Sequence, residues 1–233
     1  MTRRKSLVNT VADDLLDRII AGRFAPGDAL PTEAEIGAEF DVSRVTVREA
    51  LRTLSARGIV RVVSGVGSRV APVEEWSSVS DALRFRAAHG DDALVAEQLI
   101  STRRLIECEA AALAASIVDD AALAECAACV DEMVAGAAAG DVDRFVEADL
   151  RFHAVILGAS DNLFLGVLLA PLTEVLAERR AQTSRVPEIQ EHAIEEHRRI
   201  LAALGSRDPE AARAAMDHHL QQTLDDFRRY VAG

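Results

Sequence analysis

Apolar residues recur at helical spacing in two segments near the start of the chain. In residues 7–21 they fall roughly on one stripe, which predicts an amphipathic helix. After Ser43, the side chains of Val47, Leu51 and Leu54 lie at positions i, i+4 and i+7. This spacing predicts a second helix that buries one face against a core.

A short helix is predicted between these two segments. Residues 32–35 (Thr-Glu-Ala-Glu) have the sequence of a capping box and mark its start, and it runs to about Phe40. Residues 41–43 then form a tight turn, in which Ser43 is a natural N-cap for the next helix. Helix, three-residue turn and helix is the layout of the helix-turn-helix motif, whose second helix reads DNA.

The second helix of this motif carries the chemistry that reading DNA requires. Arg44 and Arg48 are four residues apart and share a face away from the apolar positions. Their guanidinium groups can reach base edges and phosphates in the major groove, and Thr46 adds a contact near the helix start. Ser43, at the start of this helix, belongs to the same predicted DNA-binding set.

A glycine-rich hairpin is predicted directly after this helix. Gly58 ends the helix, and residues 59–63 and 69–71 are β-branched runs. Gly65 and Gly67 lie between them, and the lack of side chains lets such a tip approach a phosphate backbone closely. Together with the helices before it, the hairpin predicts a winged helix-turn-helix.

Three spaced motifs make this resemblance specific. They are PGDALPTEAEIG, VSRVTVREALRTL and RGIVRVVSGVGSRV, and they occur in this order. Residues 7–71 resemble the winged-helix domain of the GntR family of bacterial transcription regulators. The resemblance implies that the protein binds double-stranded DNA as a homodimer at an inverted repeat.

The charge of the chain is unevenly distributed. The net charge of the 233 residues is −12, which is unusual for a DNA-binding protein. Residues 1–72 carry 11 Lys and Arg against 9 Asp and Glu, a net charge of +2. Residues 73–233 carry 15 against 29, a net charge of −14. The acidic excess therefore lies outside the predicted DNA-binding part.

The composition also indicates where the protein works. No apolar run approaches the roughly 18 residues of a membrane span, and no apolar signal core follows the basic residues near the N-terminus. We therefore expect a cytoplasmic protein without a membrane partner.

The three cysteines, Cys108, Cys126 and Cys129, lie in Ala-rich sequence, where we expect small buried residues on helices rather than a redox or metal motif.

The rest of the chain is predicted to be helical. Residues 72–91 contain Pro, Ser and Gly, and residues 73–91 are interpreted as a linker with one short helix near 79–88. Residues 92–233 form the second domain, an all-α bundle, after the winged helix of residues 1–72. Turn residues divide this bundle into about six helices: 93–117, 120–136, 142–157, 162–182, 188–204 and 209–231.

Histidines give this bundle its candidate chemistry. Asp149 and His153 are at i, i+4, so they lie on one side of the predicted helix 142–157. By spacing alone this pair is either a surface ion pair or part of a metal site. His197 and His219 lie on other helices, and spacing alone does not separate a core or surface histidine from a ligand.

A second resemblance favours the metal site. Residues 93–231 resemble the ligand-binding (FCD-type) domain of the FadR-like branch of the same family, in pieces such as DLRFH (149–153) and EHRRILAA (196–203). The resemblance implies that Asp149, His153, His197 and His219 bind a divalent metal ion. Zinc is the expected ion, and nickel and manganese remain possible. The other histidines, His89, His192 and His218, are off this pattern and are expected on the surface.

The resemblance also implies a ligand for this centre. Three neutral imidazoles and one carboxylate leave a divalent ion with a net charge of about +1 and open positions, which favours a small carboxylate effector. Arg103 is placed nearby by the resemblance and would bind that effector. The alternative for Arg103 is an ion pair with Glu107, at i, i+4 on the helix surface.

These features predict a ligand-responsive transcription regulator, and we expect repression that the effector relieves. A metal sensor, in which the ion itself is the signal, remains an alternative. A metal-dependent hydrolase is a remote alternative. The sequence offers no motif for a general base or nucleophile beside the proposed metal ligands.

Overall fold

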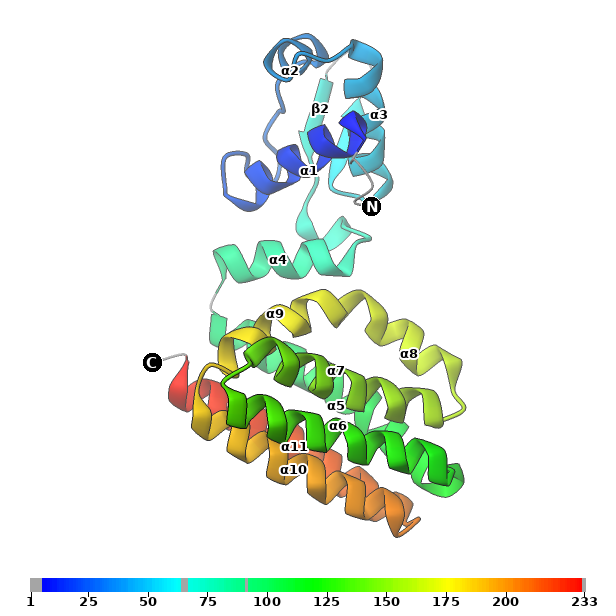
Figure 1. The fold of residues 1–233 in the computed structure, drawn as a ribbon. Helices are drawn as coiled ribbons and strands as arrows, with labels where there is room; N and C mark the ends of the chain where they lie inside the picture. Colours follow the sequence, from blue (N-terminus) through cyan, green and yellow to red (C-terminus); the bar gives the residue numbers. More distant parts are fainter. Residues whose placement is uncertain (1–5, 64–66, 91, 232–233) are drawn as a thin grey trace. The chain divides into compact units, whose positions relative to one another are not determined.

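The computed structural model describes residues 6–63, 67–90 and 92–231. The chain divides into two compact units, Met1–Gly90 and Asp91–Gly233 (Figure 1). Gly65, which we expect at the tip of the hairpin, lies outside the described residues.

The first unit is a winged helix-turn-helix, as the sequence predicts. Its antiparallel hairpin pairs Val60 with Val70 and Val63 with Gly67. The elements are α1 (Leu7–Ile20), α2 (Glu33–Glu39), α3 (Arg44–Ala56), β1 (Val60–Val63) and β2 (Gly67–Val70).

Side-chain caps fix the turn between α2 and α3. The Thr32 hydroxyl accepts a hydrogen bond from the Glu35 N–H at 3.3 Å, and the Glu35 carboxylate accepts one from the Thr32 N–H at 2.8 Å. The Ser43 hydroxyl accepts from the Thr46 N–H at 3.2 Å. These contacts satisfy N–H groups that a helix start leaves without partners, so the predicted capping box and N-cap are confirmed.

The core of this unit sets the direction of α3. Val47 and Leu54 are fully buried, together with Leu15 and Ile19 of α1 and Ile36 of α2. Because one face of α3 is buried against these helices, its opposite face carries exposed polar side chains.

Residues 73–90, interpreted above as a linker, pack onto the winged helix. They form a 3-10 turn, η1 (Val73–Glu75), and a helix, α4 (Val79–His89). Trp76 and Phe85 belong to the core of the first unit, and the Trp76 indole donates to the Ala71 carbonyl at 3.1 Å. A buried carboxylate, Asp81, pairs with Arg57 at the end of α3. Only one of these aromatic residues, Phe85, lies in α4, and a single aromatic residue gives no periodicity, so the sequence predicted the helix but not its packing.

Gly58 is the position where this packing tolerates no side chain. Its φ is +72°, and a Cβ built on it would lie 2.5 Å from the Glu75 carbonyl oxygen. We expect Gly58→Ala to lower the free energy of unfolding of this unit by about 2–4 kcal/mol, since backbone strain and a backbone clash add. Urea unfolding of the full chain, followed by circular dichroism, measures this loss.

Gly27 provides the matched control for that measurement. Its φ is +94°, but nothing lies within 4 Å of a Cβ built on it. Gly27→Ala should therefore cost only the backbone strain of about 1–2 kcal/mol. Equal losses in the two variants would show that the contact with Glu75 has no influence on stability.

The second unit is the all-α bundle that the sequence predicts (Figure 1). Five of the expected helices are confirmed with ends within about three residues. Its described helices are α5 (Asp92–Ile117), α6 (Asp120–Ala139), α7 (Val142–Ala159), α8 (Leu163–Leu169), α9 (Thr173–Thr183), α10 (Pro187–Gly205) and α11 (Pro209–Tyr230).

The prediction of one continuous helix over 162–182 is wrong. The segment is divided into α8 and α9 by a 3-10 turn, η2 (Ala170–Leu172). Pro171 lies in this turn, and its ring removes the backbone N–H that a continuous helix would need. Asn162 is the N-cap of α8, because its side chain accepts a hydrogen bond from the Phe164 N–H at 3.2 Å.

Small side chains let the helices of the bundle approach closely. Four alanines of α5 (Ala110, Ala111, Ala114 and Ala115) are fully buried in its main core. Cys108, Cys126 and Cys129 are buried and free, which confirms their interpretation as small residues on helices.

Among the described residues, no helix is both long and apolar enough to cross a membrane.

Candidate functional site

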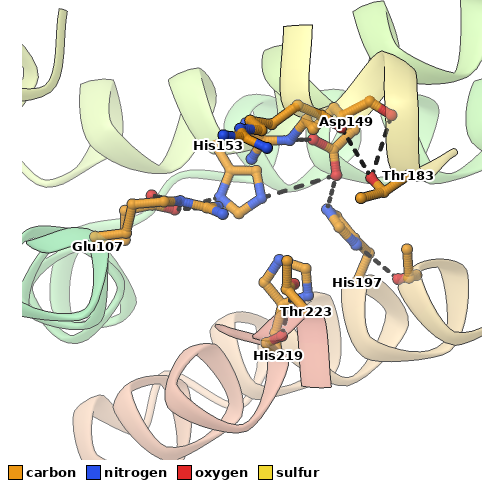
Figure 2. A network of polar contacts seen from close by, with 11 residues as sticks. Glu107, Asp149, His153, Thr183, His197, His219 and Thr223 are labelled. Atoms are coloured by element: carbon orange, nitrogen blue, oxygen red, sulfur yellow. Dashed lines mark hydrogen bonds and ion pairs between the residues drawn. The ribbon is translucent and has the colours of Figure 1, made fainter. Parts of the chain in front are cut away.

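Three histidines from three helices meet inside the bundle. His153 of α7, His197 of α10 and His219 of α11 each offer a ring nitrogen, and these nitrogens lie within 4.8 Å of one another. The ring centroids are 4.6 to 5.3 Å apart, and none of the three residues is more than 5% exposed. Figure 2 shows the three rings turned toward a common centre.

Asp149 lies beside this group, as the resemblance implies (Figure 2). Its Oδ1 is 3.1 Å from His197 Nε2 and 4.0 Å from His153 Nε2. Because Asp149 and His153 are one helical turn apart on α7, both side chains reach the same centre. The structure brings all four predicted ligands together, and their binding of an ion stays a prediction.

Contacts on the far side of two rings orient them. His197 Nδ1 lies 2.6 Å from the Ala193 carbonyl oxygen, to which it donates. His153 Nδ1 lies 2.6 Å from Glu107 Oε2. The His197 contact favours the proton on Nδ1, which leaves the lone pair of its Nε2 available at the centre; the His153 Nδ1 is close to Glu107 but makes no hydrogen bond of acceptable geometry with it.

Burial favours the neutral form of two of the three imidazoles, those of His153 and His219. It lowers the pKa of His153 to about 4, although the nearby Glu107 carboxylate acts in the opposite direction. Burial, together with His197 and His153, also holds the pKa of His219 well below its usual value. A neutral imidazole has a free lone pair, and that is the form that binds a metal ion.

The residues present fit a divalent cation. His153 Nε2, His197 Nε2 and Asp149 Oδ2 are buried and make no hydrogen bond of acceptable geometry. Buried polar atoms without partners are unfavourable, and an ion at the centre would satisfy the two ring nitrogens. Three imidazole nitrogens and a carboxylate oxygen are a donor set that zinc accepts.

Arg103 forms the ion pair with Glu107 that the sequence offered as an alternative. Arg103 Nε lies 2.6 Å from Glu107 Oε1, and Nη2 lies 3.3 Å from Oε2. The expectation of a helix-surface pair is wrong in its location, since both residues are only 2% exposed. Burial would raise the pKa of the Glu107 carboxyl, but Arg103 and His153 hold it well below its usual value.

Arg180 of α9 is a member of this site that the sequence analysis missed. Its Nε pairs with Asp149 Oδ2. Burial would raise the pKa of the Asp149 carboxyl, but the Arg180 guanidinium and the neighbouring histidines hold it well below its usual value. Arg180 lies far from Asp149 in sequence and on a different helix, so no spacing pattern could have joined them.

Two of the remaining histidines contact buried carboxylates. His192 Nδ1 is 2.9 Å from Asp226, and His218 Nδ1 is 2.7 Å from Glu196. The expectation of a surface position holds for His192, whose side chain is 42% exposed although its Nδ1 reaches the buried Asp226. It is confirmed for His218, and also for His89, whose exposed ring stacks on Phe85.

The predicted DNA-reading residues lie on the exposed face of α3 and beside the hairpin. Arg44 and Arg48 are exposed, and the Arg48 guanidinium donates to Glu33 at 2.9 and 3.2 Å. The Thr46 and Ser43 hydroxyl oxygens are 3.0 Å apart at the helix start. Gly67 has a φ of +105° and open space around it. Contact of these residues with DNA stays a prediction.

Comparison with protein families matches both units. Residues 7–70 match the gntR family of bacterial regulatory proteins, and residues 98–222 match the FCD domain. The Exu regulon transcriptional regulator of Escherichia coli (strain K12) is 31% identical over 247 residues, 97% of this chain and 90% of its own length. The galactonate operon transcriptional repressor of the same organism is 28% identical over 204 residues, 85% and 86% of the two chains.

Solved structures agree with this assignment. The GntR protein of Streptococcus agalactiae has 28% identity and a TM-score of 0.53, covering 94% of this chain and 99% of its own. Lar, which controls the expression of the Listeria monocytogenes agr system, has 22% identity and a TM-score of 0.70, covering 98% and 100%. At that identity, the likeness to Lar shows the fold alone.

The relatives are transcriptional regulators and repressors by name, and they share both units with this chain. The chain is therefore a DNA-binding transcription regulator of the GntR family, in which the winged helix is followed along the sequence by an FCD domain.

Proposed function

We propose that this regulator is a repressor that leaves its operator when a small carboxylate binds at a divalent metal ion in the FCD domain. Asp149, His153, His197 and His219 hold the ion, for which zinc is the first candidate. The observation that carries this proposal is the buried group of three histidines, with unpartnered ring nitrogens beside a carboxylate.

The charges around the centre favour an anionic ligand. When bound, the ion supplies a positive charge and open coordination positions for an oxygen ligand. The Asp149 carboxylate offsets part of that charge, and the Arg103 and Glu107 charges compensate each other. Arg180 adds a further positive charge next to Asp149, so a carboxylate entering this site meets cations.

The names of two relatives support the proposal that this chain represses transcription. The galactonate operon transcriptional repressor and the repressor NanR of Klebsiella aerogenes, which is 30% identical over 97% of this chain, carry that function in their names. Galactonate is itself a carboxylate, which agrees with an acid as the effector of this chain.

On the DNA side, we propose a homodimer that places its two α3 helices in successive major grooves of an inverted repeat. Arg44 and Arg48 contact base edges and phosphates, while Ser43 and Thr46 lie close enough to the helix start to contact the backbone. Gly67 lets the hairpin approach the DNA closely, because it has no side chain. Gly65, which lies outside the described residues, has the same role in this proposal. The effector acts by shifting the population between DNA-competent and incompetent dimers.

Operator binding with and without the metal tests this function. An operator fragment is first selected from random DNA by the full chain. We expect small carboxylates to weaken operator binding about 5- to 150-fold in zinc-loaded protein and to have no effect after chelation. Fluorescence anisotropy at fixed salt measures the affinities.

The same titration separates the metal sensor from the proposed function. If zinc alone changes the affinity for the operator and no carboxylate changes it further, the ion is the signal and our proposal is wrong. Chelation that leaves the response to carboxylates intact would also contradict it.

A further inference from the structure

Two small cavities of different character meet in the FCD domain. Each has a volume of about 50 Å³. Four residues line both cavities, namely Arg103, Arg180, Thr183 and Thr223. A ligand that contacts these residues can therefore extend to both sides.

The first cavity is polar and leads to the histidine centre. Asp149 and His219 line it together with Ser184 and Gln222. Its two further carboxylates already have partners, since Glu196 pairs with Arg199 at 2.7 Å and Asp226 with His192 at 2.9 Å. The cationic side of this cavity is the one formed by Arg103 and Arg180.

The second cavity is mainly apolar, although Arg179 lines it beside the four residues that it shares with the first cavity. Its wall consists mainly of aliphatic and aromatic side chains, most of them buried in the bundle. They are Ala96, Leu99, Ile100, Leu176, Leu224 and Phe227. Such a surface favours hydrocarbon and disfavours hydroxyl groups, which would lose their hydrogen bonds to water there.

The guanidinium groups of the two arginines differ in whether their N–H donors already have acceptors. Arg103 donates hydrogen bonds from Nε and Nη2 to the Glu107 carboxylate, so this edge of its guanidinium group already has a partner. Arg180 directs Nε to Asp149, and its Nη1 is buried without a hydrogen-bond partner. A buried guanidinium N–H without a partner is unfavourable, and a carboxylate oxygen is its preferred acceptor.

We propose that Arg180 anchors the carboxylate of the effector, and that the rest of the effector is a short apolar group among Leu99, Leu176 and Phe227. This inference rests on the proposed function and names the class of acid that the site takes. A volume of about 50 Å³ holds roughly three to five water-sized groups, which matches a short hydrocarbon chain.

A pair of six-carbon acids tests this class directly. Hexanoate and gluconate each have one carboxylate, but gluconate carries hydroxyl groups along its chain. We expect hexanoate to bind the zinc-loaded full chain at least about tenfold more tightly, because hydroxyl groups of gluconate that lie against Leu99, Leu176 and Phe227 find no hydrogen-bond partners there. Isothermal titration calorimetry measures both affinities. Equal affinities, or tighter binding of gluconate, would overturn the inference.

Replacing Arg180 tests the anchor. We expect Arg180→Met to weaken hexanoate binding about 10- to 100-fold, the loss of a charged hydrogen bond. The matched control is Arg185→Met, which removes the same charge from an exposed position after α9 and should leave hexanoate binding unchanged. Zinc content by mass spectrometry should be the same in both variants.

A second variant covers the case in which Arg180→Met folds poorly or loses zinc. Arg180→Lys keeps the charge but not the planar fork, and it should still bind hexanoate several-fold less tightly than the wild type. Wild-type affinity in a well-folded, zinc-loaded Arg180 variant would show that Arg180 is not the anchor.

Failure of this inference is distinguishable from failure of the proposed function. If gluconate releases the zinc-loaded protein from DNA and hexanoate does not, the proposed carboxylate-responsive repressor is supported. The proposal of an apolar effector is then wrong. If the wild-type chain takes up no divalent metal ion, both proposals are wrong, and if neither acid binds the loaded protein, the inference of an apolar acid is wrong.

Discussion

Replacing Arg48 by alanine should abolish specific operator binding, with a loss of affinity of at least about 10- to 100-fold. Arg48 lies on the exposed face of α3, four residues after Arg44, and its planar guanidinium can donate two hydrogen bonds to a guanine. Its partner in the free protein is Glu33, in an exposed ion pair that DNA can displace. Fluorescence anisotropy with the selected operator and with unrelated DNA measures the loss of specificity.

Arg52 provides the control for this variant. It lies one turn further along α3, is exposed, and forms a similar surface ion pair with Glu49 at 2.7 Å. Arg52→Ala removes the same charge, so it should lower affinity for all DNA sequences alike and leave specificity intact. Both variants should melt at the wild-type temperature, since they lose only surface pairs. Specific binding by Arg48→Ala equal to that of the wild type would show that α3 does not read DNA through this residue.

Replacing His197 by alanine should remove most of the bound metal. His197 is fully buried, and its Nε2 faces both Asp149 and the other two rings. Loss of one ligand of four should weaken metal binding by more than the 10- to 100-fold typical of losing a supporting contact. Metal content after dialysis against a weak chelator, measured by mass spectrometry, should fall from about one ion per chain to almost none.

His218→Ala is the control, because His218 is the neighbour of His219 in sequence but contacts Glu196 outside the centre. It should retain the full metal content. His197→Asn, which leaves a smaller cavity than alanine, shows whether any loss arises from poor packing instead of a missing ligand. A full metal complement in a folded His197 variant would contradict the proposed metal site.

Local signals made the DNA-binding unit predictable from the sequence. A capping box at Thr32, an N-cap at Ser43 and a glycine with positive φ at position 58 each act within a few residues. Such signals are visible in sequence because neighbouring residues alone satisfy them. The division of residues 162–182 was missed because Pro171 stands inside an otherwise uninterrupted apolar run.

The candidate metal ligands were predictable only in part. Spacing placed Asp149 and His153 on one helical face, and the resemblance added His197 and His219. The buried position of the Arg103–Glu107 pair was not expected, because helical periodicity shows that two residues share a face but not what covers that face.

By itself, the sequence determined that this chain has a winged helix followed by a helical domain, and it indicated the residues of a candidate reader helix and, with the family resemblance, of a candidate metal centre. The tertiary structure alone decided that Arg180 pairs with Asp149, that Glu107 faces His153, and that a polar and an apolar cavity meet at the two arginines. The physical reason is that these contacts join side chains from different helices. Their partners are set by how the helices pack, which no spacing within one helix specifies.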